Sequence, residues 1–128
     1  MPVVDIAGDG SFAMTANSLA TSVAEHIPVI VVVLNNNRLG MVAQWQRMFY
    51  GRREMAVNLV NLPDFVKLAE AYNAQGIRVQ SMSEFEKAVK LALSSDVTTV
   101  IDVPIDPEED VFPFVVPGKG LKDMMLTA

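Results

Sequence analysis

Four short apolar runs, each bounded by polar residues or glycine, mark the strands of this sequence. They cover residues 3–6, 29–34, 77–79 and 98–103. The run at 29–34 is rich in β-branched residues and has no polar alternation, which is typical of a strand buried on both faces. These runs therefore predict a sheet with at least one fully covered strand.

The segments between these runs have apolar residues at helical spacing. We expect helices over residues 12–25, 41–50 and 64–75, and a further helix that starts near residue 83. Pro63 lies at a first-turn position of the third helix, and Gly76 is expected to end it. Ser83 and Glu86 have the spacing of a capping box at the start of the fourth. Strands alternating with helices predict an α/β fold, a parallel sheet with helices on both faces.

Composition narrows the class of protein. The chain has 128 residues, a size that fits a single domain, and 51% of them are hydrophobic while 20% are charged. The net charge of -5 argues against a nucleic-acid partner, because phosphate backbones are bound by basic surfaces. There is no cysteine, so no disulfide framework is possible.

No segment of the sequence has the pattern of a membrane span or a signal peptide. The longest apolar stretch, Ile27 to Leu34, contains Pro28 and is far shorter than the roughly 20 residues that a span requires. The first residues run directly into a strand pattern and lack a basic start. We therefore expect no membrane partner and a cytoplasmic location, or an organelle if the source is a eukaryote.

Two charged clusters and one histidine have plain structural interpretations. The basic cluster is expected to be a solvated helix end and loop, and the acidic cluster a surface connection and not a metal site. Their members are Arg38, Arg47, Arg52 and Arg53, and Asp106, Glu108, Glu109 and Asp110. His26 follows the first helix, where a helix C-terminus stabilises a protonated imidazole, so we assign it no catalytic role.

Oxygen-bearing side chains follow the first two strands. Asp9 lies within Gly8-Asp9-Gly10 directly after the first apolar run, and Asn35-Asn36 closes the second. If the strands are parallel, both ends share one edge of the sheet, which is where open α/β sheets bind ligands. One carboxylate and one amide carbonyl suit Mg²⁺ that also binds an anionic diphosphate.

Three other motifs share some of these residue types. A dinucleotide fingerprint needs a third glycine where Ala13 stands, and the nearest acidic residue, Glu25, precedes the second strand instead of ending it. A P-loop is excluded because no Gly-Lys-Ser or Gly-Lys-Thr occurs. A pair of ordinary turns stays open on the spacing alone, since Gly, Asp and Asn are common turn residues.

The residues around this pattern resemble a known family. Gly-Asp-Gly followed by Asn-Asn is similar to the thiamine diphosphate fingerprint, and the neighbouring residues are similar to the large catalytic subunit of acetolactate synthase, also called acetohydroxyacid synthase. The segments that carry the second resemblance are 8–12, 34–36, 39–42 (Leu-Gly-Met-Val), 44–46 (Gln-Trp-Gln), 49–50 (Phe-Tyr) and 63–72, together with Pro113, Val116, Pro117 and Gly118. Gly-Met-Val-x-Gln-Trp-Gln is much more specific than the fingerprint that many thiamine enzymes share. The resemblance covers nearly the whole chain.

That family has three domains, and the resemblance implies that residues 1–128 form one of them, the C-terminal thiamine diphosphate-binding domain. The pyrimidine-binding and central domains, the glutamate that activates the cofactor and the FAD site would lie elsewhere. We therefore expect no catalytic residue in this segment and no activity from it alone. A homodimer or tetramer is implied, possibly with a regulatory small subunit.

The resemblance also implies a set of site residues. The side chains of Asp9 and Asn36 and the main-chain carbonyl of Arg38 would bind Mg²⁺. Met41 and Trp45 would contact substrate, and Trp45 matches a tryptophan associated with selecting the second 2-ketoacid. The residues expected to contact the cofactor are Gly8, Asp9, Gly10, Ser11, Asn36, Arg38, Leu39, Gly40 and Met41. Read without the family, Met41 and Trp45 would be ordinary core residues.

The implied reaction is thiamine-dependent carboligation. Pyruvate is decarboxylated and condensed with a second pyruvate or with 2-ketobutyrate, which gives acetolactate or acetohydroxybutyrate for valine, leucine and isoleucine biosynthesis. Two alternatives stay open: another thiamine enzyme, such as a decarboxylase, pyruvate oxidase or sulfoacetaldehyde acetyltransferase, and a non-catalytic assembly module.

Departures from the family pattern are few. Ser18 replaces a usual glutamate, and Asn73 stands where glycine is common, at a cost that is small because asparagine tolerates the left-handed conformation. Arg53-Glu54 replaces a usual Tyr-Ser pair. The loop from Arg52 to Val57 is therefore expected to have a different shape.

Overall fold

The sheet has four strands, and all of them are parallel. The computed structural model describes residues 1–127, and its strands lie in the order β1-β2-β4-β3. They are β1 (Val4–Gly8), β2 (Ile30–Asn35), β3 (Gln75–Arg78) and β4 (Thr99–Pro104). All four expected strands are confirmed, with ends shifted by no more than two residues.

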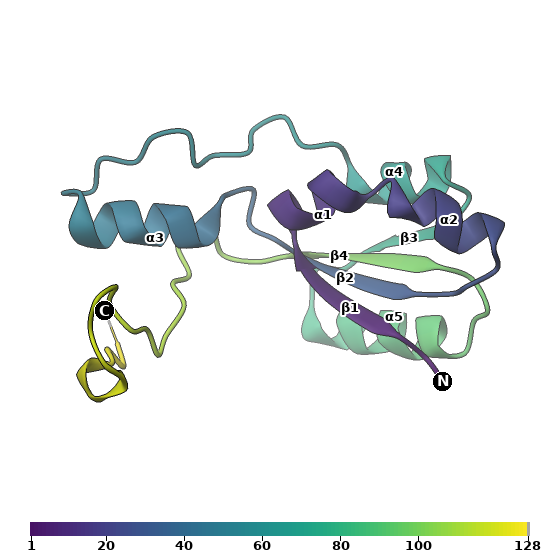
Figure 1. Cartoon of the computed structure of the whole chain (residues 1–128). Coiled ribbons are helices and arrows are strands. Elements are labelled where there is room, and N and C mark those ends of the chain that lie inside the picture. The colour runs from purple at the N-terminus through teal and green to yellow at the C-terminus, as the bar shows by residue number, and fades with distance from the viewer. Residues whose placement is uncertain (128) are drawn as a thin grey trace.

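Helices cover both faces of this sheet, as predicted (Figure 1). Figure 1 shows α1, α2 and α4 over one face and α5 over the other, while α3 lies beyond the sheet with the C-terminal segment. The helices are α1 (Asp9–Thr15), α2 (Ser18–Ala24), α3 (Gly40–Phe49), α4 (Phe65–Ala71), α5 (Met82–Leu93) and the short 3₁₀ helix η1 (Leu121–Asp123). Within residues 1–127, no helix is long and apolar enough to cross a bilayer.

Alternate residues of β2 supply both halves of the core. Val31 and Val33 belong to a cluster with Phe12 of α1 and Phe65 of α4. Ile30 and Val32 belong to a second cluster that includes Ala88 and Ala92 of α5. The division follows from strand geometry, in which successive side chains point to opposite faces. The prediction that this strand is buried on both faces is confirmed.

The predicted helix over 12–25 is wrong in one respect, because the structure divides it into α1 and α2. The break falls at Ala16 and Asn17. The Thr15 hydroxyl donates to the backbone carbonyl of Ser11 at 3.2 Å, a contact of the kind that bends helices. Backbone bonds then span three residues, from Leu19 to the Ala16 carbonyl at 3.1 Å, which tightens the turn between the two helices.

The predicted end of the third helix at Gly76 is also wrong. Helix α4 ends at Ala71, and Asn73 adopts the left-handed conformation, with φ at 60°. Gly76 lies in β3, where a Cβ atom would stand 2.6 Å from the Val66 carbonyl oxygen. Glycine is therefore required there because α4 and β3 approach each other at backbone distance.

Both later helices start within one residue of the prediction, at Phe65 and Met82, but other residues than expected lie at their boundaries. Asp64, and not Pro63, lies at the boundary of α4, where its carboxylate accepts from the backbone N–H groups of Val66 and Lys67. Helix α5 is capped by Ser81 and not by Ser83: the Ser81 hydroxyl accepts from the Glu84 backbone N–H at 3.2 Å. These two side chains satisfy donors that a helix start leaves free.

Candidate functional site

The ends of β1 and β2 lie side by side at the carboxyl edge of the sheet. Gly8 pairs with Leu34 in the parallel register, so Asp9 and Asn35 are the next residues after this pair on the two neighbouring strands. Asn35 in turn pairs with Pro104 at the end of β4. The sequence-based expectation that these polar residues share one edge is confirmed.

Asp9 has a buried carboxylate with one oxygen unpaired. The residue is 2% exposed and begins α1. Its Oδ1 accepts from the Gly10 backbone N–H at 2.7 Å, whereas its Oδ2 is buried and has no hydrogen-bond partner within residues 1–127. A buried carboxylate oxygen without a partner is unfavourable unless a cation or donor satisfies it. Asp9 therefore fits a ligand of a hard cation.

The asparagines form a tight turn beside it. The Asn35 side-chain oxygen accepts from the Asn37 N–H at 3.2 Å, and the Asn36 Oδ1 accepts from the Arg38 N–H at 3.0 Å. Asn37 adopts a left-handed φ of 54°. Each side-chain oxygen closes a local turn of the backbone, and an amide oxygen has a second lone pair. The Asn36 oxygen can therefore accept one more bond.

Arg38 is held by a short antiparallel bridge to Asn58. Leu39 N–H donates to the Val57 carbonyl and Leu59 N–H to the Asn37 carbonyl, each at 2.8 Å. In such a bridge the N–H and C=O of the central residue point to the same side, away from its partner. The Arg38 N–H meets the Asn36 side chain, and within residues 1–127 no backbone N–H donates to the Arg38 carbonyl. This carbonyl is available as a ligand on the side where Asn36 lies.

Neither glycine of the Gly-Asp-Gly motif adopts a positive φ. Gly8 has a φ of -79° and Gly10 lies within α1, so neither needs the left-handed conformation. A Cβ atom on Gly10 would stand 3.1 Å from the Leu39 side chain. On Gly40 it would stand 2.9 Å from the Asn36 side-chain nitrogen, so Gly40 gives that side chain room at the start of α3. The Ser11 hydroxyl donates to the Gly8 carbonyl at 2.9 Å.

An open hollow lies next to the turn. It has a volume of about 490 Å³, within the range of small-molecule sites. Its lining includes Asn36, Arg38, Asn58, Pro104 and Glu108. Within the described residues no group of three acidic or histidine side chains could hold a metal ion. Asp9 is not among the residues that line this hollow. A cation held by Asp9, Asn36 and main-chain oxygen would need an anionic ligand as well.

A chain of ion pairs, which sequence reasoning missed, is connected to the asparagine turn through Asn35. Asp102 in β4 is fully buried: its Oδ1 accepts from the Asn35 amide at 3.0 Å and its Oδ2 from Arg78 Nε at 2.9 Å. Arg78 also contacts Asp64 at 3.1 Å. The Asp102 hydrogen bond raises the pKa of Arg78, and the Lys67 backbone N–H, with Arg78, lowers the pKa of Asp64. The sequence contains one sign of this network, because Asp102 is a carboxylate inside an otherwise apolar strand.

Helix α3 presents its aromatic residues to the C-terminal segment, not to the sheet. The ring of Trp45 contacts Phe49 and Phe114 edge to face, with centroids 6.4 and 6.2 Å apart. Trp45 is 37% exposed and Met41 56% exposed, so neither is the core residue that the sequence alone would suggest. Gln44, by contrast, is 1% exposed and exchanges two 3.1 Å hydrogen bonds with the Val111 backbone.

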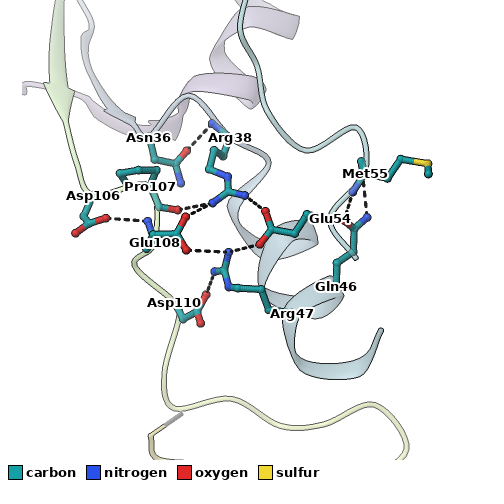
Figure 2. Close-up of polar contacts among 10 residues, drawn as sticks. All are labelled: Asn36, Arg38, Gln46, Arg47, Glu54, Met55, Asp106, Pro107, Glu108 and Asp110. Atoms are coloured by element: carbon teal, nitrogen blue, oxygen red, sulfur yellow. Dashed lines mark hydrogen bonds and ion pairs between the residues drawn. The ribbon is translucent and has the colours of Figure 1, made fainter. Parts of the chain in front are cut away.

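The predictions for the two charged clusters are partly wrong. Arg38 and Arg47 are largely buried and pair with acidic residues (Figure 2). Arg52 and Arg53 are exposed, as expected. Glu108 and Asp110 belong to this network, so the acidic stretch is a structural contact and not only a surface connection. The burial arises because residues 106–110 pass alongside α3, which composition does not reveal.

Comparison with known proteins identifies the class. Residues 1–103 match the family described as "Thiamine pyrophosphate enzyme, C-terminal TPP binding domain". The chain belongs to this family. The match includes both strand ends and the asparagine turn.

Curated relatives narrow the resemblance further. The chain is 42% identical over 123 residues to a probable acetolactate synthase large subunit of Methanocaldococcus jannaschii, covering 96% of the chain and 21% of the relative. It is 41% identical over 128 residues to acetolactate synthase isozyme 3 large subunit of Escherichia coli, covering 98% and 22%. The chain thus spans about a fifth of the length of these relatives.

A solved structure supports the fold. The benzoylformate decarboxylase from Polynucleobacter necessarius matches with a TM-score of 0.79 and 33% sequence identity, over 85% of this chain and 20% of that one. The parallel sheet with helices on both faces is therefore the thiamine diphosphate-binding fold expected from the sequence.

Proposed function

We propose that this chain anchors the diphosphate of thiamine diphosphate through Mg²⁺, as the C-terminal domain of an acetolactate synthase catalytic subunit. The observation that carries the proposal is the buried, unpaired Oδ2 of Asp9 at the strand end beside the asparagine turn. Mg²⁺ that also binds phosphates is usually held by one or two carboxylates, and Asp9 would supply one.

The other ligands come from the turn. Asn36 would offer the free lone pair of its side-chain oxygen and Arg38 its main-chain carbonyl, which no backbone N–H within residues 1–127 occupies. Backbone groups of Gly8 and Gly10, with the Ser11 hydroxyl, would contact the diphosphate. Leu39, Gly40 and Met41 would lie along the cofactor. When bound, thiamine diphosphate supplies the decarboxylation and carbon–carbon bond chemistry, and the protein orients it.

Identity of the reaction rests on the relatives. Similarity to acetolactate synthases at about 40% identity supports a carboligase that uses pyruvate and takes pyruvate or 2-ketobutyrate as acceptor. The exposed Met41 and Trp45 on α3 would then contact substrate. A whole enzyme of this kind would also contain the pyrimidine-binding and central domains and FAD. It would form a homodimer or tetramer with a regulatory small subunit, in the cytoplasm or an organelle.

The second candidate is a thiamine-dependent decarboxylase, which the structural likeness to benzoylformate decarboxylase favours. It differs from the first in the fate of pyruvate after carbon dioxide leaves. A carboligase transfers the two-carbon unit to a second 2-ketoacid, whereas a decarboxylase releases an aldehyde.

A chimera tests the reaction. The matching fifth of the Escherichia coli isozyme 3 large subunit is replaced with this chain, and the products from pyruvate are measured. We expect acetolactate, and its loss on Asp9→Asn, whereas Asp5→Asn on the exposed part of β1 keeps the activity. Acetaldehyde in place of acetolactate would support the decarboxylase. If the unmodified and Asp5→Asn chimeras both fold but are inactive, the proposal is contradicted.

A further inference from the structure

The guanidinium of Arg38 lies between two acidic side chains that come from distant parts of the chain. Nη2 pairs with Glu54 and Nη1 with Glu108, and only 8% of the Arg38 side chain is exposed (Figure 2). Nη1 also donates to the Pro107 carbonyl at 3.4 Å. The side chain thus joins the loop after α3 to the segment after β4, directly at the asparagine turn.

Both acidic residues are themselves held in place. The backbone of Met55, next to Glu54, exchanges hydrogen bonds of 2.7 and 3.2 Å with the Gln46 side chain of α3. The Glu108 backbone N–H donates to the Asp106 carboxylate at 2.8 Å. Arg47 adds a second link, since its Nη1 lies 3.1 Å from Glu54 and 3.8 Å from Glu108. Contacts of both acidic partners with neighbouring residues therefore help to fix where the Arg38 guanidinium lies.

The same residue carries the main-chain carbonyl that the proposed function assigns to Mg²⁺. We propose that Arg38 is a positioning residue: its ion pairs with Glu54 and Glu108 fix the bridge to Asn58, so that its own carbonyl and the Asn36 side chain are presented together to the metal. This inference rests on the proposed function.

Electrostatics gives a second reason why Arg38 pairs with two acidic side chains. A guanidinium next to a divalent cation repels it, and the repulsion is larger in a buried site than in water. Glu54 and Glu108 neutralise Arg38 where it is buried, and neither is needed as a ligand. Their removal would leave both a looser turn and an uncompensated positive charge beside the metal.

The experiment uses three isosteric variants of the full chain: Glu54→Gln, Glu108→Gln and, as a matched control, Glu109→Gln. Glu109 is exposed, adjacent to Glu108, and forms no ion pair within residues 1–127. The Glu108 side chain is 65% exposed, so its variant is expected to fold. Calorimetry measures the apparent Mg²⁺ affinity at fixed thiamine diphosphate, and thiamine diphosphate affinity at saturating Mg²⁺.

We expect Glu54→Gln and Glu108→Gln to weaken the apparent Mg²⁺ affinity by about tenfold, the size of effect known for residues that orient metal ligands. Thiamine diphosphate affinity at saturating Mg²⁺ should change little, because the metal site is then filled in the variants as well as in the parent. Amide hydrogen exchange at Leu39 and Leu59 should become faster than in the control, since their bonds form the bridge. Exchange in β2 should stay unchanged.

Equal Mg²⁺ affinity in the variants and the Glu109→Gln control would overturn the inference while leaving the proposed function intact. A fall in both affinities, with faster exchange throughout the sheet, would also overturn it, because it would indicate general structural damage. Failure of the unmodified chain to bind thiamine diphosphate in a Mg²⁺-dependent way would instead refute the proposed function.

Discussion

The side-chain amide of Asn35 donates a 3.0 Å hydrogen bond to the buried carboxylate of Asp102. The oxygen of the same amide accepts from the Asn37 N–H, so Asn35 joins the turn that carries the candidate ligands to the last strand of the sheet. Asp102 also pairs with Arg78. One buried carboxylate thus links the site to α4 through Arg78 and Asp64.

Replacing Asp102 with asparagine should destabilise the fold. An asparagine can accept from only one of the two donors, Asn35 or Arg78, because its other terminus is itself a donor. The loss should be about 1–3 kcal/mol of unfolding free energy, limited by the 43% exposure of Arg78, which can turn toward water. Urea denaturation measures it. Asp96→Asn, at an exposed position with the same chemical change, is the control, and an equal loss in both variants would contradict this account.

The cap of α4 should make stability depend on pH in the acid range. The pKa of Asp64 is lower in the folded chain, first because the Lys67 backbone N–H donates to it and also because of Arg78. The folded state therefore binds fewer protons than the unfolded state near the ordinary value of 3.8. The stabilisation is complete above that value and disappears as pH falls through the lower folded pKa.

Asp64→Asn tests this linkage, because asparagine caps helices about as well as aspartate but does not titrate in this range. Thermal unfolding followed between about pH 5 and pH 2 should show a smaller loss of stability for the variant than for the parent chain. If the plots of stability against pH are parallel for the variant and the parent chain, the cap contributes nothing to acid denaturation.

Gly76→Ala should be among the most destabilising single substitutions in the chain. The added methyl would meet the Val66 backbone at 2.6 and 2.8 Å, where no flexible side chain can move aside. Overpacking of this kind costs about 1–3 kcal/mol or more. Chemical denaturation measures the loss.

Gly8→Ala is the matched comparison, since its methyl would meet only Ser11 Oγ at 3.6 Å and its φ of -79° suits alanine. That variant should keep its stability. Reduced thiamine diphosphate binding by a stable Gly8→Ala chain would support a backbone contact with the diphosphate at this residue. Similar instability of both alanine variants would contradict the contact geometry.

The sequence predicted the sheet better than the helix ends. Apolar β-branched runs identify buried strands whatever surrounds them, as at Val31 and Val33. Helix boundaries depend on short-range chemistry that the sequence leaves ambiguous: both Ser81 and Ser83 have a glutamate three residues later, and only the structure shows that Ser81 caps α5. Gly76 was misread because it is needed for close packing of α4 on β3, a contact between distant residues.

The candidate site was predictable in its outline for a similar reason. Asp9 and Asn36 follow strand ends, and parallel strands bring such ends together. Three contacts could not be predicted: Asp102 with Asn35, Gln44 with Val111, and Arg38 with Glu108. Each of them joins residues more than 60 positions apart. Composition suggests only that such charged residues should be exposed.

Gln44 should control the attachment of the C-terminal segment to α3. Gln44→Leu would remove both hydrogen bonds to the Val111 backbone. Val111 is 57% exposed, so water can replace the lost partner, and each bond should contribute about 0.5–1.5 kcal/mol. Because the chain has a single tryptophan, Trp45, whose ring contacts Phe114, its fluorescence reports the contact. We expect a red-shifted emission and faster proteolysis after residue 105. Gln80→Leu, at an exposed position, should show neither change; an unchanged Gln44→Leu spectrum would refute this role.

The most direct measurement is a calorimetric titration of the chain with thiamine diphosphate, with and without Mg²⁺, in the parent, Asp9→Asn and Asp5→Asn forms. Circular dichroism first establishes that each form is folded. The account predicts binding that requires Mg²⁺, is lost in Asp9→Asn and is kept in Asp5→Asn. Binding that is equally strong without Mg²⁺, or that survives in Asp9→Asn, would contradict the assignment of Asp9 as the metal-binding carboxylate.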